Sequence, residues 1–423
     1  MEALVLFGIF FLLLILSVPI GYAIGISTLI TLHLFTYMPN LMIVQYSVAG
    51  VDSFALLAIP FFMLAGNLMS SGGIAKRLVD FFEGFIGHIT GGLGMVTIIV
   101  CMFFAAISGS AVATVSAVGA FMIPEMVKHG YDLGFSAALT AAAGTIGVII
   151  PPSVPFVIYG VVSGSSITEM FTAGFLPGIL MGVALMIVCY IVSKKRGYRG
   201  RDRNKDEKIN VFKSFKEAFW AILSPIIILG GIYSGLFTPT EAAVVSVVYS
   251  FVIGVFVYKE LDFKGTYKAF KDAIVVNGAT TFMIGLSTAF AALLTVEQIP
   301  IKIATFITSL SDNGVIILLL INILLIIVGM FIDNIPATII LTPILLPIAT
   351  SFGMSPITFG IMLTMNLAIG FCTPPYGINL FVAAAISKVK INVISKDIMR
   401  FIFALLMVLM VVTYFHPLTT VFL

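Results

Sequence analysis

Charged residues are scarce in this sequence. Only 10% of its 423 residues are Asp, Glu, Lys or Arg, whereas 60% are hydrophobic and the mean hydropathy is +1.17. Soluble chains carry about a quarter charged residues on average. With so little charge the chain cannot form a soluble globule, and we expect a protein that lies in a lipid bilayer.

Cysteine and histidine are also rare. The three cysteines lie far apart in apolar segments without CxxC spacing, so neither a disulfide framework nor a metal knuckle is indicated. The four histidines lie near the ends of apolar runs, and none neighbours a serine in a recognisable triad. No GxxxxGK[ST] phosphate loop occurs, so ATP is not expected to bind. We therefore predict no enzyme and no cofactor.

The apolar residues form long runs. Many runs are about 20 residues long, which is the length of a helix that crosses the hydrocarbon core, whereas a barrel would show alternating strands of about ten residues. The first run reaches Phe35 without a basic start or a small-residue cleavage site, so we interpret residues 3–35 as a span and not as a signal peptide. The sequence predicts an all-α polytopic membrane protein.

The second half of the chain repeats the first at an offset of 223 residues. Gly147-Val-Ile-Ile-Pro-Pro returns as Gly370-Phe-Cys-Thr-Pro-Pro, since 147 plus 223 is 370, and the same offset aligns Ser110 with Asp333. Interruptions at matching places in two copies of a membrane unit indicate the binding site of a secondary transporter.

Each repeat is expected to contain the same series of elements. The first repeat, 1–193, is predicted to hold an interfacial arm helix at 74–88, a hairpin at about 108–130 and a broken helix at about 133–163. The second repeat, 218–423, is predicted to hold an arm helix at about 299–311, a hairpin at about 331–352 and a broken helix at about 355–387. A basic amphipathic stretch at 259–272 and a separate span at 273–296 precede the second arm.

The segment between the repeats is strongly basic. Ten of the 22 lysines and arginines lie between Lys194 and Lys216. A short loop of this kind stays on the cytoplasmic side, so we interpret 194–217 as a cytoplasmic linker that sets the orientation. No aromatic interleaving or folded basic domain accompanies it, and a nucleic-acid partner is not expected.

One carboxylate lies alone in the second predicted hairpin. Asp333, followed by Asn334, is the only Asp, Glu, Lys, Arg or His residue between Asp312 and Lys388. A charge within a membrane segment costs at least about 2.5 kcal/mol, so this carboxylate is expected to face a cavity, an ion or a partner. The aligned part of the first repeat, Ser108-Gly-Ser110, offers oxygen ligands without the charge.

The double prolines interrupt the helices that follow the hairpins. Proline has no N–H, so Pro151 and Pro152 remove the helical partners of the Gly147 and Val148 carbonyls, and the second pair does the same to Gly370 and Phe371. Unpaired carbonyls are tolerated in a membrane where they line a cavity or coordinate a cation such as Na⁺. A plain proline kink is the alternative, and the repetition in register argues against it.

Together these motifs resemble the large membrane subunit, of DctM type, of tripartite ATP-independent periplasmic (TRAP) transporters. The motifs are the Ser-Gly-Ser tip, the Gly-x-x-x-Pro-Pro-Ser-x-Pro break, the Asp-Asn-x-Pro-Ala-Thr tip and the Thr-Pro-Pro-Tyr-Gly-x-Asn break, and the resemblance covers essentially the whole chain. It implies two inverted-topology repeats with re-entrant hairpins, an elevator fold similar to the ion-transporter superfamily, and Na⁺-coupled import of an organic acid.

The resemblance also implies partners and site residues. The partners are a small four-helix membrane subunit of DctQ type and a periplasmic substrate-binding protein of DctP type, in a bacterial inner membrane. One Na⁺ site would use Ser108 and Ser110 with carbonyls around Gly147, Ile150 and Pro152. The other site would use carbonyls near Gly329 and Gly370 with Thr373 and the Tyr376 region. The residues expected to face substrate or a further cation are Ser108, Ser153, Asp333, Asn334 and Asn379.

Two other functions remain open from the sequence. A carrier of the same superfamily that works without partners would show the same broken helices. An intramembrane enzyme would need catalytic groups that the histidine and carboxylate inventory does not supply. Which acid is carried does not follow from these residues.

Overall fold

The computed structural model describes residues 2–36, 38–200, 211–310 and 313–423, and every regular element in these ranges is a helix. Nine of the described helices are long and apolar enough to cross a membrane. A helix satisfies its own backbone hydrogen bonds, so it is the form that long apolar runs adopt in lipid. The predicted all-α class is confirmed.

The first repeat contains ten α-helices. In chain order they are α1 (Glu2–Ile15), α2 (Ile20–Phe35), α3 (Leu41–Val51), α4 (Ala58–Ser71), α5 (Ile74–Ile86), α6 (Gly92–Ser108), α7 (Ala111–Lys128), α8 (Leu133–Gly144), α9 (Val154–Ser163) and α10 (Ile167–Arg196). Short 3₁₀ turns at Phe54–Leu57 and Thr145–Val148 precede α4 and follow α8.

The second repeat contains the other ten. They are α11 (Val211–Tyr233), α12 (Pro239–Val252), α13 (Phe263–Val296), α14 (Ile299–Leu310), α15 (Gly314–Phe331), α16 (Asn334–Ser351), α17 (Pro356–Gly370), α18 (Ile378–Ser387), α19 (Ile391–Tyr414) and α20 (Pro417–Thr420). The offset of 223 seen in the sequence recurs in the helices, because α7 begins at residue 111 and α16 at residue 334.

Three expectations about single elements were wrong. The run 3–35 is two packed helices, α1 and α2, because Ser17 has a left-handed φ of 62° and Pro19 precedes α2. The stretch 259–272 and the span 273–296 are largely one continuous helix, α13. It contains no proline, and its glycines do not interrupt it. The amphipathic residues are therefore the first part of α13 and not a separate helix.

The two hairpins were also placed too far along the chain. Residues 111–128 and 334–351 each form a single helix, so neither 108–130 nor 331–352 folds back on itself. The hairpins are α6 with α7 and α15 with α16, and their tips lie at 109–110 and 332–333. Apolar α6 and α15 look like ordinary spans in the sequence, which hid their role as the first arms.

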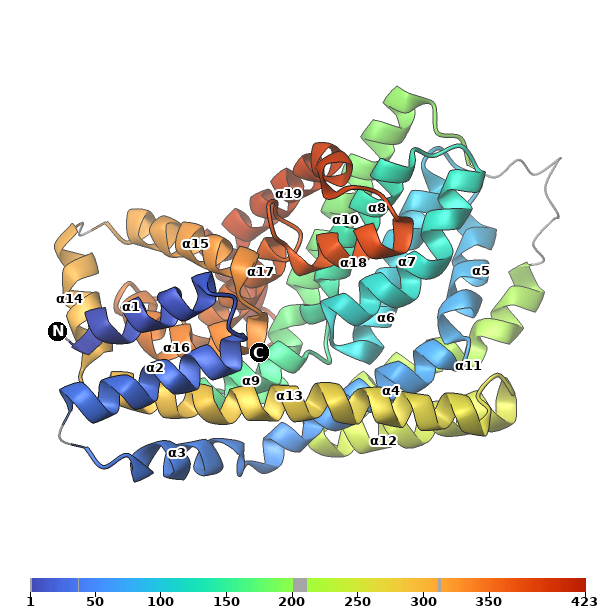
Figure 1. Ribbon diagram of the computed structural model, residues 1–423. Coiled ribbons are helices and arrows are strands. Elements are labelled where there is room, and N and C mark those ends of the chain that lie inside the picture. The colour runs from blue at the N-terminus through green and yellow to red at the C-terminus, as the bar shows by residue number, and fades with distance from the viewer. Residues whose placement is uncertain (1, 37, 201–210, 311–312) are drawn as a thin grey trace.

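The repeats interlock around the hairpins. The second arm of each hairpin packs against the helix that follows the break in the other repeat: α7 contacts α18, and α16 contacts α9. Helices α3, α4, α12 and α13 lie along one long edge of the molecule (Figure 1), and α4 and α13 pack against each other there. Both hairpins and both breaks therefore meet next to a layer of long helices.

The end of α10 joins the two repeats through an ion cluster. The guanidinium of Arg196 donates to both carboxylate oxygens of Asp397 on α19 and, at 3.0 Å, to Asp132 ahead of α8. Tyr198 also donates to Asp132. The expected linker 194–217 begins within α10 and ends within α11, and its residues 201–210 lie outside the described ranges.

Candidate functional site

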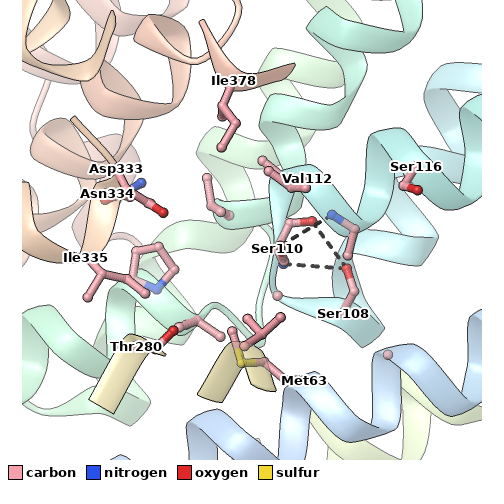
Figure 2. A pocket seen from close by; sticks show the side chains of 18 of the residues that line it. Met63, Ser108, Ser110, Val112, Ser116, Thr280, Asp333, Asn334, Ile335 and Ile378 are labelled. Carbon is pink, nitrogen blue, oxygen red and sulfur yellow. Dashed lines mark hydrogen bonds between the residues drawn. The ribbon is translucent and has the colours of Figure 1, made fainter. Parts of the chain in front are cut away.

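A cavity of about 410 Å³ lies where the two hairpin tips, the two breaks, α4 and α13 meet. Figure 2 shows Asp333 and Asn334 on one side of it and Ser108 and Ser110 on the other. The tips thus approach one space from opposite sides, as inverted repeats require. Its lining includes Met63, Asn67, Ser108, Ser110, Ser116, Val148, Thr280, Asp333, Asn334, Phe371 and Ile378.

The first tip is a tight connection between α6 and α7. Gly109 has a left-handed φ of 59°, and a Cβ there would lie 2.8 Å from the carbonyl oxygen of Pro152, so only glycine fits against the first break. The backbone N–H of Val154 donates to the Gly109 carbonyl at 3.3 Å. Ser110 caps α7 by accepting from the Ala113 N–H at 3.4 Å. The tip is therefore held by the break that it faces.

Oxygen atoms gather behind the first tip. The hydroxyl oxygens of Ser108 and Thr114 are 3.2 Å apart, and Thr114 Oγ1 donates to the Ser110 carbonyl at 2.8 Å. A Cβ on Gly147 would lie 2.6 Å from Thr114 Oγ1 and 2.7 Å from the Ser110 carbonyl oxygen. The separations between the oxygens are those of hydrogen bonds, and they gather three oxygen atoms of the type that a hard cation binds.

The second tip brings a carboxylate and an amide to the cavity. Asp333 is half-buried at the start of α16, and Asn334 is only 2% exposed. The Asn334 side-chain oxygen accepts from Thr338 at 3.1 Å, whereas its Nδ2 has no hydrogen-bond partner. A buried amide group without a partner is costly, so Nδ2 is a donor available to a ligand. Among the described residues that line the cavity, none is Lys, Arg or His.

Both breaks are present, and both contain a cis peptide bond, at Pro151–Pro152 and Pro374–Pro375. The expectation that their carbonyls are unpaired was wrong for three of the four. Val148 accepts from the Ser153 hydroxyl at 2.6 Å, Gly370 from the Thr373 N–H at 3.0 Å, and Phe371 from the Asn379 N–H at 2.9 Å. The chain folds back at each break and supplies new donors. Since a carbonyl has two lone pairs, each oxygen can still accept a second ligand.

The predicted site residues are only partly brought together. Ser108, Ser110, Asp333 and Asn334 line the cavity, and Gly147 contacts the first oxygen cluster. Ser153 and Asn379 are fully buried at the starts of α9 and α18, and Asn379 Nδ2 donates to the Ala141 carbonyl at 3.1 Å. The remaining predicted residues do not line the cavity; they are Ile150, Pro152, Gly329, Gly370, Thr373 and Tyr376.

The residues predicted for the second ion site lie close together at the second break, apart from the ring of Tyr376. Gly329 and Gly370 meet backbone to backbone, because a Cβ on Gly370 would lie 2.6 Å from the Gly329 Cα. Thr373 Oγ1 donates to the Ile369 carbonyl at 2.7 Å, one turn away. The side chain of Tyr376 is 56% exposed and packs against Phe331 and Phe381 on the outside. Only the backbone near Tyr376 can belong to an ion site here.

Sequence reasoning missed the wall formed by α4 and α13. Met63 and Asn67 on α4 and Thr280 on α13 line the cavity (Figure 2 labels Met63 and Thr280). No local signal marks them, because single polar residues on apolar helices are common packing groups. The described residues contain no group of three His, Cys, Asp or Glu side chains that could hold a metal ion.

Proteins of known family align in sequence with nearly the whole of this chain. The family described as Tripartite ATP-independent periplasmic transporter, DctM component, matches residues 7–418. The isethionate TRAP transporter permease protein DctMQ of Oleidesulfovibrio alaskensis is 44% identical over 97% of this chain, which spans 64% of that protein. The sialic acid TRAP transporter large permease protein SiaM of Vibrio cholerae is 39% identical over 96% of this chain and 95% of its own length.

Solved structures share the fold at low identity. The YdaH transporter of Alcanivorax borkumensis superposes with a TM-score of 0.64 at 13% identity, over 90% of this chain and 87% of its own. MtrF of Neisseria gonorrhoeae gives a TM-score of 0.57 at 12% identity, over 93% and 95%. With a family match over nearly its whole length, this multi-pass chain belongs to the DctM family, the large permease component of TRAP transporters.

Proposed function

We propose that this chain is the large permease of a Na⁺-coupled importer of a small organic acid. The observation that carries the proposal is the single cavity to which both tips contribute, with a hydroxyl and carbonyl cluster on one side and a lone carboxylate on the other. Oxygen-rich broken helices of this kind bind coupling ions and substrate together in secondary transporters.

The electrostatics of the cavity favour an anion only together with a cation. The starts of α7 and α16 border the space with their positive dipole ends, which attract a carboxylate or sulfonate. The charge of Asp333 opposes that anion, and no basic side chain among the described lining residues offsets it. A bound Na⁺ supplies the missing positive charge, so binding of the ion and of the acid is linked.

The substrate is an organic acid of modest size. Relatives of this chain are named for isethionate, sialic acid and C4-dicarboxylates, which share an anionic head and polar groups. The positive helix ends suit the anionic head, and Asn334 Nδ2 suits a hydroxyl or carbonyl oxygen. Its volume of about 410 Å³ accommodates any of the three.

Transport is proposed to proceed by an elevator movement in a bacterial inner membrane. The hairpins and broken helices form the moving part and slide against α4, α12 and α13. A small four-helix subunit supports the long helices, and a periplasmic binding protein delivers the acid. The layer of long helices along one edge of the molecule (Figure 1), where α13 contacts α16 and α4 contacts α6, supports this division of roles.

The decisive experiment is uptake into proteoliposomes. The vesicles contain this chain with its small subunit, the cognate binding protein is added outside with radiolabelled acid, and an inward Na⁺ gradient is compared with an equal choline gradient. We expect accumulation only with Na⁺. Uptake that is equal in both gradients would reject Na⁺ as the coupling ion, whereas it would leave the acid-transport part of the proposal intact.

A carrier that works alone is the second candidate, since its cavity would look the same. Purification of tagged chain from its native membrane distinguishes the two, because a TRAP permease should bring a small membrane subunit with it. Uptake of free acid by the chain alone, without binding protein, would favour the stand-alone carrier.

A further inference from the structure

We propose that the buried pair Asn322 and Asn366 positions the second cation site by fixing how α15 and α17 pack. The inference rests on the proposed Na⁺ coupling and adds residues that do not themselves contact the ion. The pair lies outside the cavity, and neither residue belongs to the tips or the breaks.

The two asparagines form a polar link inside an apolar helix seam. Both are 0% exposed. Asn366 Nδ2 donates to Asn322 Oδ1 at 2.6 Å, and Asn322 Nδ2 donates to the Thr413 hydroxyl on α19 at 3.2 Å. Thr413 in turn donates to the Leu409 carbonyl at 2.8 Å. Three helices are therefore connected by side-chain hydrogen bonds where their other contacts are mainly between apolar residues.

The link lies on the same seam as the two glycines of the second site. Asn366 and Gly370 are four residues apart on α17, and Asn322 and Gly329 are seven apart on α15, so each pair shares one helix face. Gly329 and Gly370 touch through their backbones, and a Cβ on Gly329 would also lie 2.8 Å from the Leu367 carbonyl oxygen. The hydrogen bond between the two asparagine side chains thus sets the register at which these backbones meet.

The first repeat solves the same packing problem without polar groups. At the offset of 223, Asn322 aligns with Ile99 and Asn366 with Ala143, and the polar link is absent from the aligned pair. Helices α6 and α8 nevertheless contact each other, so this hydrogen bond is not needed simply to pair the helices. Apolar contacts allow sliding along the seam, whereas a directional hydrogen bond does not.

The retained polar pair also has a cost that packing does not explain. Asn366 Oδ1 is buried without a hydrogen-bond partner. An unsatisfied buried polar atom lowers stability, and an apolar pair would avoid that loss. A polar pair that specifies a single register at some cost in stability is known from helix–helix packing elsewhere.

The test is a Na⁺ titration of thermal stability, with the purified two-subunit permease in detergent and choline chloride holding the ionic strength constant. A ligand that binds only the folded state raises the unfolding midpoint with concentration. The double variant Asn322→Ile with Asn366→Ala carries the residues of the first repeat. We expect it to need at least fivefold more Na⁺ than wild type for half of the maximal rise.

The matched control is Thr419→Val. Thr358 and Thr419 form another buried interhelical hydrogen bond to α17, with hydroxyls 2.7 Å apart, but at the opposite end of that helix from Gly370. Its loss should lower stability equally with and without Na⁺ and leave the half-maximal concentration within twofold of wild type.

The outcomes separate this inference from the proposed function. An unchanged half-maximal Na⁺ concentration in the double variant would overturn the positioning role. A wild type that responds identically to Na⁺ and choline would instead refute the proposed coupling ion. If the double variant does not fold, Thr413→Val removes only the hydroxyl that Asn322 donates to. It should raise the half-maximal concentration at least twofold, and no rise would overturn the inference.

Discussion

Replacement of Gly370 by alanine should destabilise the protein through one close backbone contact. The new Cβ would lie 2.4 Å from the Gly329 carbonyl carbon and 2.6 Å from its Cα. Carbon atoms prefer separations of about 3.5 Å or more, so α15 and α17 must move apart by roughly 1 Å. A backbone atom cannot rotate out of the way as a side chain can. Overpacking of this kind costs about 1–3 kcal/mol.

The assay is the thermal unfolding midpoint of the purified permease. We expect Gly370→Ala to lower it by roughly 2–5 °C, since the shift per kcal/mol falls with chain length. Gly278→Ala is the control: Gly278 lies within α13, and a Cβ there has nothing within 4 Å. Alanine improves helix propensity by about 0.5–1 kcal/mol, so this variant should be unchanged or slightly more stable. A Gly370→Ala midpoint at or above wild type would refute the close contact.

Three further variants test the site and its frame. Asp333→Asn should reduce Na⁺-driven uptake at least tenfold at unchanged abundance, whereas Asp272→Asn on the exposed start of α13 should not; equal activity of both would remove Asp333 from the site. Thr114→Val should raise the Na⁺ concentration for half-maximal uptake at least fivefold, and Thr97→Val, equally buried on α6, should leave it unchanged. Asp397→Asn should cost about 1–2 kcal/mol, measured as a lower unfolding midpoint, because Arg196 then keeps only Asp132 as a carboxylate partner; no change would show that the pair with Asp397 is dispensable.

Local features of the chain predicted a large part of this fold. Apolar runs of helical length, the offset of 223 residues and the double prolines each depend on neighbouring residues only, so the sequence shows them directly. Ser110 and Asp333 were singled out in this way, and both begin the second arm of a hairpin next to the cavity. The predicted helix boundaries were wrong where one helix joins a basic amphipathic stretch to an apolar one, as in α13.

The partners of the broken backbone could not be predicted. Proline removes a helical donor, which is a local effect, but the replacement donors depend on how the chain turns afterwards. Ser153 satisfies Val148, and the N–H groups of Thr373 and Asn379 satisfy the second break. Nor did the sequence show that Gly370 packs into a helix seam or that the Tyr376 side chain points outward.

By itself the sequence determined that this protein is helical, duplicated and interrupted at two matching places, because chain length, hydropathy and proline act within a few residues. Only the tertiary structure decided that α7 packs on α18 and α16 on α9, which brings both tips to one cavity. Those contacts join residues that are far apart in the chain, and they depend on the shapes of whole helix faces. Two features depend on those contacts and could not be predicted from the sequence. They are the cavity wall formed by α4 and α13 and the hydrogen bond between Asn322 and Asn366.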